Sequence, residues 1–174
     1  GINVTLPYKE IIMQYIDELN PRARSIGSIN CIMLSKGKTI GNNTDWYGFS
    51  KMLEREKINV SGKEVIILGA GGVARSVIFS LKQLGVNNIC VLNRTVSKAQ
   101  TLEDNLVSTH WLEQADQFIH DDSIIVNCTS MGMDNNSCPI PKSLISEKQI
   151  LIDTIYNPIE TQFLRLGRLN NALV

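Results

Sequence analysis

The sequence has few of the residues that hold metals or disulfides. It contains four cysteines and two histidines. No two cysteines form a C-x-x-C clip, so reduced thiols are expected and a metal site is not. An excess of charge is also lacking, because 17 lysines and arginines balance 17 aspartates and glutamates. Nucleic acids and anionic membranes both attract a basic excess, so neither is expected as a partner.

Long hydrophobic runs and targeting segments are absent as well. No apolar run approaches the roughly 20 residues that span a bilayer, and residues 1–10 lack the basic start and apolar block of a secretory signal. These absences predict a cytoplasmic protein. An initiator methionine is also missing, which we interpret as the mark of a fragment. The 43% of hydrophobic residues can bury the core of one ordinary domain or two small ones.

From about residue 61 onward, short apolar segments alternate with amphipathic ones. The pattern predicts strands at 64–68, 88–92, near 109, 123–127 and 149–153, and helices at 73–84, 96–106, 112–118 and 158–169. Short apolar strands that alternate with helices are typical of βαβ units and a parallel sheet. The fold class is therefore predicted as α/β, with a doubly wound parallel sheet.

The first 60 residues follow a different pattern. Apolar side chains at helical spacing predict an amphipathic helix over 8–19 with Thr5 as its N-cap. An extended region is expected at 26–34, a turn at 36–38 and a second helix over about 46–57. The clearest break in the chain lies at 60–63.

A glycine loop follows the first apolar strand and opens the next helix. It reads Gly69, Ala70, Gly71, Gly72, Val73, Ala74, which fits G-x-G-x-x-[GA]. In that pattern the first glycine permits a tight turn, the second lets the backbone approach a pyrophosphate, and the third small residue allows close packing of helix on strand. Between a strand and a helix the motif predicts a dinucleotide site, whereas the alternative is a turn that serves sheet geometry alone.

The end of the second apolar strand bears on which dinucleotide binds. NAD sites usually carry an acidic residue there for the ribose hydroxyl, but this chain has Asn93, Arg94 and Thr95, with Lys98 one turn further on. A guanidinium and an ammonium suit the 2′-phosphate of NADP. The alternative is an ordinary solvent-facing arginine.

Three polar residues of the first 60 are candidates for chemistry. Lys9 can move a proton or can be a solvated surface lysine, and Asp45 can act in catalysis or can cap the helix that follows it. Asn30 lies within an apolar stretch, as either a ligand contact or a turn residue. The residues alone leave these readings open.

Several motifs, taken in order, resemble those of shikimate dehydrogenases. They are Asn3–Glu10 (NVTLPYKE), Ser28–Asn30 (SIN), Asn43–Asp45 (NTD), Gly69–Arg75 (GAGGVAR), Asn93–Thr95 (NRT), Asn127–Met133 (NCTSMGM) and Asp153–Thr161 (DTIYNPIET). The resemblance implies NADPH-dependent reduction of 3-dehydroshikimate to shikimate, in the pathway to chorismate and the aromatic amino acids. It implies part of a smaller α/β substrate-binding domain over 1–46, a connecting helix and linker over 47–60, and a Rossmann-like NADP-binding domain over 61–174.

The resemblance also assigns roles. Lys9 and Asp45 become the catalytic pair, with Asp45 also contacting substrate. Substrate contacts are further implied for Thr5, Asn30 and Tyr156. Cofactor contacts are implied for the glycine loop and for Asn93, Arg94, Thr95, Lys98, Thr129 and Met131. The partner is then a small-molecule substrate, and a homodimer is compatible with the family.

Some positions depart from the family's pattern. Trp46 stands where the family usually has glycine, and Lys98 where many NADP-preferring members have arginine. Family members carry more chain on both sides, including substrate-contacting residues, so weak or absent activity is expected of these 174 residues alone. An NAD-dependent quinate/shikimate dehydrogenase and a non-catalytic NADP-binding module are the alternatives.

Overall fold

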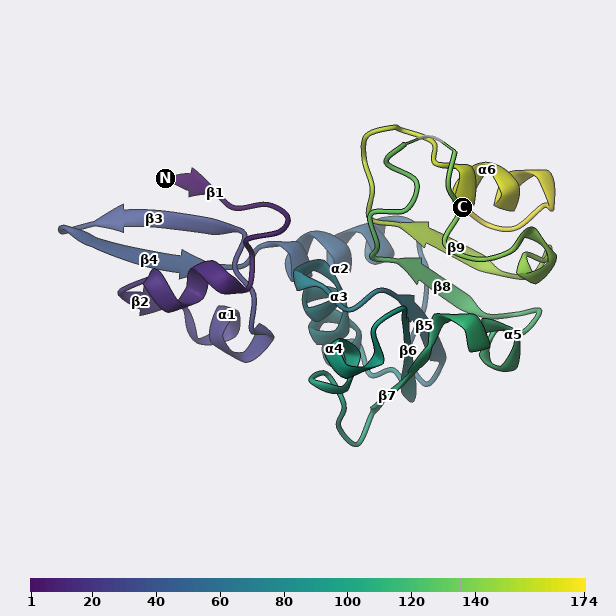
Figure 1. The fold of residues 1–174 in the computed structure, drawn as a ribbon, viewed down its shortest axis with the longest axis horizontal. Coiled ribbons are helices and arrows are strands. Elements are labelled where there is room, and N and C mark those ends of the chain that lie inside the picture. Colours follow the sequence, from purple (N-terminus) through teal and green to yellow (C-terminus); the bar gives the residue numbers. More distant parts are fainter. Residues whose placement is uncertain (135) are drawn as a thin grey trace. The chain divides into compact units, whose positions relative to one another are not determined.

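The computed structural model describes residues 1–134 and 136–174, which divide into two compact units. The first unit comprises Gly1–Val60 and Gly71–Gly85, and the second comprises Ser61–Ala70 and Val86–Val174. The ribbon of each is shown in Figure 1. Among the described residues, no helix has the length and apolar character needed to cross a membrane.

A four-stranded mixed sheet lies in the first unit. Its strands run in the order β1 (Ile2–Asn3), β3 (Cys31–Ser35), β4 (Lys38–Asn42) and β2 (Glu18–Leu19). β3 and β4 form an antiparallel hairpin, and the two residues between them, Lys36 and Gly37, have φ angles of 50° and 76°. Positive φ at both positions gives a two-residue turn whose twist matches the strands. The predicted turn is thus confirmed.

Three α-helices belong to this unit, α1 (Pro21–Ile26), α2 (Asp45–Arg55) and α3 (Gly72–Gln83). α2 packs on α3 through a hydroxyl pair, with Ser50 Oγ 2.7 Å from Ser80 Oγ, and through the edge-to-face rings of Trp46 and Phe79, whose centroids are 5.5 Å apart. The indole at position 46 is therefore used as a packing contact between two helices. Arg22 completes its surroundings with a guanidinium 5.1 Å from the ring.

The helix predicted over residues 8–19 is wrong. The segment forms the short 3₁₀ helix η1 (Ile11–Tyr15) and then β2, and Thr5 caps no helix. β2 pairs in parallel with β4, through Glu18 with Ile40 and Leu19 with Gly41. A backbone that joins a sheet at Glu18 cannot continue a helix, so pairing with a distant strand overrides the local periodicity.

The second unit is built on a parallel sheet of five strands. They run in the order β7 (Val107–Trp111), β6 (Asn88–Asn93), β5 (Glu64–Leu68), β8 (Ile124–Asn127) and β9 (Ile150–Asp153). Each neighbouring pair is parallel and in continuous register. The first strand of this sheet in the chain, β5, lies at its centre. β6 and β7 follow on one side of β5, and β8 and β9 then follow on the other side. That reversal beside β5 is a topological switch point, where α/β sheets bind ligands.

Shorter helical segments complete this unit. They are α4 (Val96–Gln100), η2 (Leu112–Gln114), α5 (Ala115–Phe118), η3 (Lys142–Leu144) and α6 (Gln162–Leu169). The helix predicted over 96–106 thus ends early. Asp104 Oδ1 accepts a hydrogen bond from the Leu106 N–H at 2.9 Å, and a local side-chain acceptor of this kind competes with the helical pattern.

The core of the second unit explains its apolar strands. Ile66 and Leu68 of β5, Ile125 of β8 and Leu151 of β9 belong to one buried cluster with Phe163 of α6, and each is at most 1% exposed. Strands of a parallel sheet are covered on both faces, so they carry continuous apolar runs instead of alternation. For this reason the strands could be read directly from the sequence.

Candidate active site

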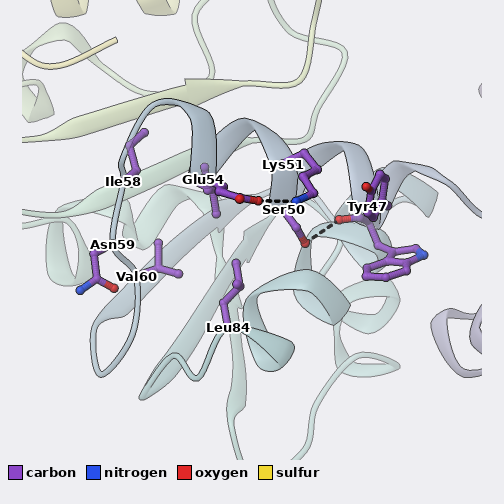
Figure 2. A pocket seen from close by; sticks show the side chains of 10 residues that line it. Tyr47, Ser50, Lys51, Glu54, Ile58, Asn59, Val60 and Leu84 are labelled. Carbon is purple, nitrogen blue, oxygen red and sulfur yellow. Dashed lines mark hydrogen bonds and ion pairs between the residues drawn. The ribbon is translucent and has the colours of Figure 1, made fainter.

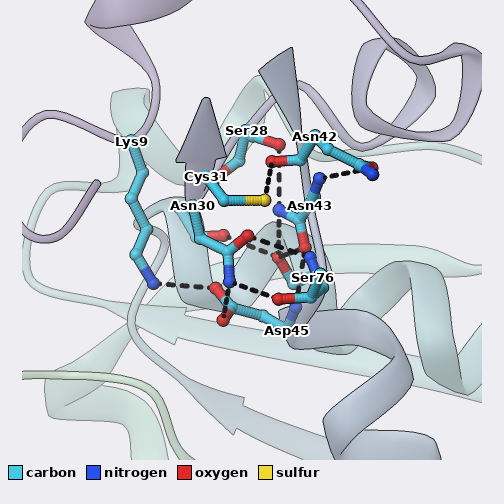
Figure 3. A network of polar contacts seen from close by, with 10 residues as sticks. Lys9, Ser28, Asn30, Cys31, Asn42, Asn43, Asp45 and Ser76 are labelled. Carbon is cyan, nitrogen blue, oxygen red and sulfur yellow. Dashed lines mark hydrogen bonds and ion pairs between the residues drawn. The ribbon is translucent and has the colours of Figure 1, made fainter. Parts of the chain in front are cut away.

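An ion pair between Lys9 and Asp45 is the centre of the candidate site in the first unit (Figure 3). Lys9 Nζ donates to Asp45 Oδ2 at 2.7 Å, and the two side chains are only 15% and 27% exposed. The Lys9 backbone is anchored where its carbonyl accepts from the Ile29 N–H at 2.8 Å. The reading of Lys9 as a solvated surface lysine is therefore wrong.

Asn30 and Thr44 hold the other side of the carboxylate. The Asn30 amide donates to Asp45 Oδ1 at 2.7 Å and to Thr44 Oγ1 at 2.8 Å, and its oxygen accepts from the Thr44 N–H at 2.9 Å. Both carboxylate oxygens of Asp45 are thus hydrogen-bonded. The arrangement fixes the direction from which Lys9 approaches.

Asp45 does not cap the helix that it starts. Thr44 is the N-cap residue of α2, no side chain caps this end, and Asp45 is the first helical residue. A carboxylate in the first turn is favoured by the helix dipole, while its oxygens remain available for Lys9 and Asn30. The capping alternative is wrong, and the side chain is directed into the pair.

The start of α3 lies against Lys9. A Cβ added at Gly72 would stand 2.8 Å from Lys9 Cβ and 2.7 Å from Ser28 Oγ, so only glycine fits there. A Cβ at Gly71 would meet nothing within 4 Å, and Gly71 is an N-cap without a side-chain hydrogen bond. The first N–H groups of a helix lack intrahelical acceptors. An open approach to such groups fits a phosphate of a dinucleotide.

The rest of the glycine loop is shaped by close contact. Gly69 has a φ of +101°, and a Cβ there would be 3.1 Å from the backbone carbonyl of Cys128 and 3.0 Å from a Thr129 methyl. Ala70 is 3% and Ala74 0% exposed, and Val73 is half-buried. Positive φ and the tight approach both require glycine at 69.

The cationic residues after β6 lie at the surface of the second unit. Asn93 Nδ2 donates to the Thr95 carbonyl at 2.8 Å and so shapes this loop. Arg94, Thr95 and Lys98 are exposed, and within the described part of the chain neither cation forms an ion pair. Both positive charges are therefore available to an anionic ligand.

Asn127 organises the loop that carries Thr129 and Met131. Its Oδ1 accepts from the Thr129 hydroxyl at 2.7 Å, and its amide donates to the Met131 carbonyl at 3.1 Å and to Asp153 Oδ1 at 3.1 Å. Asn127 is fully buried, so these bonds replace water completely. One amide thus joins the carboxyl ends of β8 and β9.

The Asp153 carboxylate organises the loop after β9. It accepts from the Thr161 hydroxyl at 2.7 Å and from the Ile155 N–H at 3.0 Å. Burial raises the pKa of the Asp153 carboxyl above its usual value, while these hydrogen bonds oppose the rise. Tyr156 follows on this loop and is 88% exposed.

Two predicted residues lie outside these networks. Thr5 is exposed, and its carbonyl accepts from the Tyr8 N–H at 2.9 Å. The Tyr156 side chain is nearly free of protein contact. A substrate that contacts Thr5 or Tyr156 would therefore do so at the surface of the unit to which that residue belongs.

A pocket of about 380 Å³ lies beside α2 (Figure 2), and neither Lys9 nor Asp45 lines it. It is lined by residues of α2, by residues 58–60 and by Leu84, and the ion pair of Lys51 with Glu54 lies along it. Of the described residues predicted to act in catalysis or binding, none lines this pocket. It is therefore not the candidate active site.

The sequence predicted no role for five residues that hold these networks together within each unit. They are Asn43, Thr44, Ser76, Asn127 and Asp153. Asn43 and Thr44 stand directly before Asp45, and Asn127 and Asp153 each close an apolar strand with a polar group. Such positions are a usable signal, since a polar group next to a buried strand needs a partner. Ser76 carries no signal, because a helical serine alone does not reveal what faces it.

The fold and the site together define a class. A parallel sheet in this strand order, with a glycine loop after its central strand, is a Rossmann-like dinucleotide-binding unit, and the first unit adds a lysine–carboxylate pair. The chain belongs to the shikimate/quinate 5-dehydrogenase family. The family profile described as "Shikimate / quinate 5-dehydrogenase" matches residues 51–153, and that described as "Shikimate dehydrogenase substrate binding domain" matches residues 1–32.

Individual relatives agree with this assignment. The chain is 37% identical over 176 residues to the shikimate dehydrogenase (NADP(+)) of Clostridium perfringens, covering 98% of this chain and 64% of that protein. It therefore spans just under two-thirds of the length of this relative. The predicted family and α/β Rossmann-like fold are confirmed.

Solved structures show the same fold. The shikimate 5-dehydrogenase of Thermus thermophilus in complex with NADP(H) and shikimate superposes with a TM-score of 0.84 at 33% identity, over 99% of this chain and 64% of that one. The quinate dehydrogenase of Corynebacterium glutamicum in complex with NAD gives 0.85 at 30% identity, over 98% and 64%.

Proposed function

We propose that this protein reduces 3-dehydroshikimate to shikimate, reversibly and with NADPH. The single observation that carries the proposal is the shielded Lys9–Asp45 ion pair, 2.7 Å long, in a chain of this family. The activity of the Clostridium perfringens relative and the ligands of the Thermus thermophilus structure support the substrate and the cofactor. The expected cytoplasmic location and homodimer stay predictions.

Lys9 is the proton donor of the proposed reaction. Reduction of a ketone adds a hydride to the carbonyl carbon and a proton to its oxygen, and bound NADPH supplies the hydride. The Lys9 ammonium gives the proton to the oxygen, and in the reverse direction its amine takes a proton from the hydroxyl. Each direction therefore needs one proton exchanged between Lys9 and solvent per turnover.

Asp45 orients Lys9 and takes part in substrate binding. Its Oδ2 accepts from Lys9 Nζ, which holds the ammonium in place, while Asn30 fixes Oδ1. Correct placement of a proton donor contributes strongly to rate, since small misplacements are costly. Thr5, Asn30 and Tyr156 are the further substrate contacts of the proposal.

The cofactor contacts of the proposal follow the glycine loop and the ends of the strands. They are Gly69, Ala70, Gly71, Gly72, Val73, Ala74, Asn93, Arg94, Thr95, Lys98, Thr129 and Met131. The open helix start at Gly71 suits the pyrophosphate. Arg94 and Lys98, exposed and free of ion pairs with the described residues, suit the 2′-phosphate.

An NAD-dependent quinate/shikimate dehydrogenase is the second candidate. The likeness to the quinate dehydrogenase of Corynebacterium glutamicum in complex with NAD favours it. Steady-state turnover with NADPH and NADH, on 3-dehydroshikimate and 3-dehydroquinate, separates the two functions. Preference for NADH would contradict the assignment of Arg94 and Lys98 to a phosphate.

The catalytic pair is tested by Lys9→Ala. Loss of the proton donor is expected to lower kcat by at least about 100-fold, the usual contribution of general acid catalysis, while NADPH affinity from fluorescence titration stays nearly unchanged. The matched control is Lys38→Ala, which removes a lysine paired with Glu18 at 2.6 Å but 61% exposed. Equal kcat for wild type and Lys9→Ala would remove Lys9 from the mechanism.

A further inference from the structure

A buried polar pair lies next to Asp45 and is formed with helix α3 (Figure 3). The Asn43 amide donates to Ser76 Oγ at 2.9 Å, and Ser76 Oγ lies 3.2 Å from Asn43 Oδ1. Asn43 is 2% and Ser76 0% exposed. Water cannot replace either partner at such positions, so loss of one leaves the other short of a hydrogen bond.

The Asn43 side chain also hydrogen-bonds to the backbone next to each member of the Lys9–Asp45 pair. Its Oδ1 accepts from the Asp45 N–H at 3.0 Å, and its amide donates to the Ser28 carbonyl at 2.8 Å. Ser28 directly precedes Ile29, whose N–H donates to the Lys9 carbonyl. One side chain therefore ties the backbone of Asp45 to the segment that holds Lys9.

The first two turns of α3 contact the Lys9 side as well. Gly72 leaves room for Lys9 Cβ, and Arg75 Nε is 3.1 Å from Glu10 Oε2, in the residue after Lys9. Gly72, Arg75 and Ser76 thus face Lys9, Glu10 and Asn43 in turn. The helix that begins at the glycine loop therefore contacts the segments that carry Lys9 and Asp45.

We propose that Ser76 is a positioning residue for Asp45, acting through Asn43. The inference rests on the proposed function in that the positioned pair is the catalytic one. Among the described residues, Ser76 forms no hydrogen bond with Lys9 or Asp45. Its hydroxyl fixes the rotamer of Asn43, Asn43 Oδ1 fixes the first amide of α2, and the carboxylate of Asp45 then meets Lys9 and Asn30 in one geometry.

The test compares Ser76→Ala with a matched control on the same helix. Ser80 is also a serine of α3, is 0% exposed, and makes a hydroxyl bond of 2.7 Å to Ser50 on α2. Ser80→Ala therefore removes a buried hydroxyl of the same helix, one that contacts α2 and not Asn43. Any general loss of stability is shared by the two variants.

The first readout is the exchange rate of the Asp45 backbone amide, measured by NMR. It does not depend on activity. Relative to Ser80→Ala, the Ser76→Ala variant is expected to exchange this amide about tenfold faster, because the side chain of its acceptor Asn43 then otherwise keeps only the hydrogen bond to the Ser28 carbonyl. Equal exchange in the two variants overturns the proposal.

The second readout is steady-state turnover. Ser76→Ala is expected to lower kcat about tenfold with little change in KM for NADPH, while Ser80→Ala keeps the wild-type kcat. A wild-type kcat in Ser76→Ala overturns the proposal. If Lys9→Ala turns over as fast as the wild type, the proposed role of Lys9 fails, while the Asp45 exchange rates still decide the role of Ser76.

A conservative variant guards against misfolding. Ser76→Cys keeps a weak donor and acceptor at the same position, and its Asp45 amide is expected to exchange at a rate between those of wild type and Ser76→Ala. If the Asp45 amide exchanges as slowly in Ser76→Cys and in Ser76→Ala as it does in Ser80→Ala, the Ser76 hydroxyl does not position Asp45.

Discussion

Lys9 and Asp45 lie 36 positions apart in the chain, yet their charged groups are 2.7 Å apart. Both side chains are mostly shielded from solvent, whereas in the pair of Lys38 with Glu18 both are at least half exposed. A shielded pair is less screened by water and salt than a surface pair. Shielding of this kind distinguishes the proposed proton donor Lys9 from the surface lysine Lys38.

Two glycines on neighbouring helices give opposite predictions at the residue scale. Gly72→Ala is expected to lower the free energy of unfolding by about 1–3 kcal/mol, because the new Cβ falls 2.7–2.8 Å from Ser28 Oγ and Lys9 Cβ. Gly48→Ala, inside α2 with nothing near its Cβ, is expected to raise it by up to about 1 kcal/mol. Urea unfolding measures both, and a stabilised Gly72→Ala would contradict the contact with Lys9.

At the scale of elements, the carboxyl ends of β8 and β9 are joined by side chains as well as by the backbone pairing of Asn127 with Asp153. Asn127 reaches Asp153 and the Met131 carbonyl, and Asp153 reaches Thr161 at the start of α6. The two loops with the proposed ligand contacts Met131 and Tyr156 therefore start from one polar cluster. Since the Asp153 carboxylate is partly buried, its ionisation costs free energy in the folded state.

A pH dependence follows for Asp153. Its pKa is raised on folding, so its protonated form stabilises the fold below the ordinary value of 3.8, and that contribution is lost as pH rises through the raised pKa. Asp153→Asn removes this titration. The free energy of unfolding of Asp153→Asn minus that of wild type is expected to increase from pH 3.5 upward across this window, as measured by urea titrations. A difference that stays constant with pH would show that Asp153 titrates normally.

At the scale of the whole molecule, the chain is organised as two compact units that share the glycine loop. The second unit ends at Ala70, and the first takes up the chain again from Gly71 to Gly85. The helix start that is proposed for the pyrophosphate thus belongs to the same unit as Lys9 and Asp45. The domain division proposed from the sequence, at residues 46 and 60, remains a proposal.

Ligand linkage gives a prediction for the chain as a whole. At about 100 times its Kd, a ligand of the folded state adds about 2.7 kcal/mol and raises the Tm of a chain of this size by about 5–10 °C. NADPH is expected to raise the Tm more than NADH at equal concentration. Arg94→Ala should remove the difference, and Arg55→Ala, an exposed arginine on α2, should keep it. Equal shifts with both cofactors in wild type would argue against a 2′-phosphate contact.

The sequence by itself determined the parallel sheet, the glycine loop and the identity of the candidate residues. Buried parallel strands need continuous apolar runs, so β5 was predicted with the bounds the structure has. A glycine that is required by positive φ or by close approach also indicates a turn or a tight contact in the sequence, as Gly69 does.

Only the tertiary structure decided which polar residues meet. Local periodicity predicted a helix over 8–19, but that segment forms the short 3₁₀ helix η1 and then β2, in which Glu18 and Leu19 pair with β4. From local sequence, helix capping was a better supported role for Asp45 than catalysis, but in the structure its oxygens accept from Lys9 and Asn30. Ser76 reaches Asn43 from 33 positions away. Contacts of this length depend on how the elements pack, and local sequence preference carries no record of that packing.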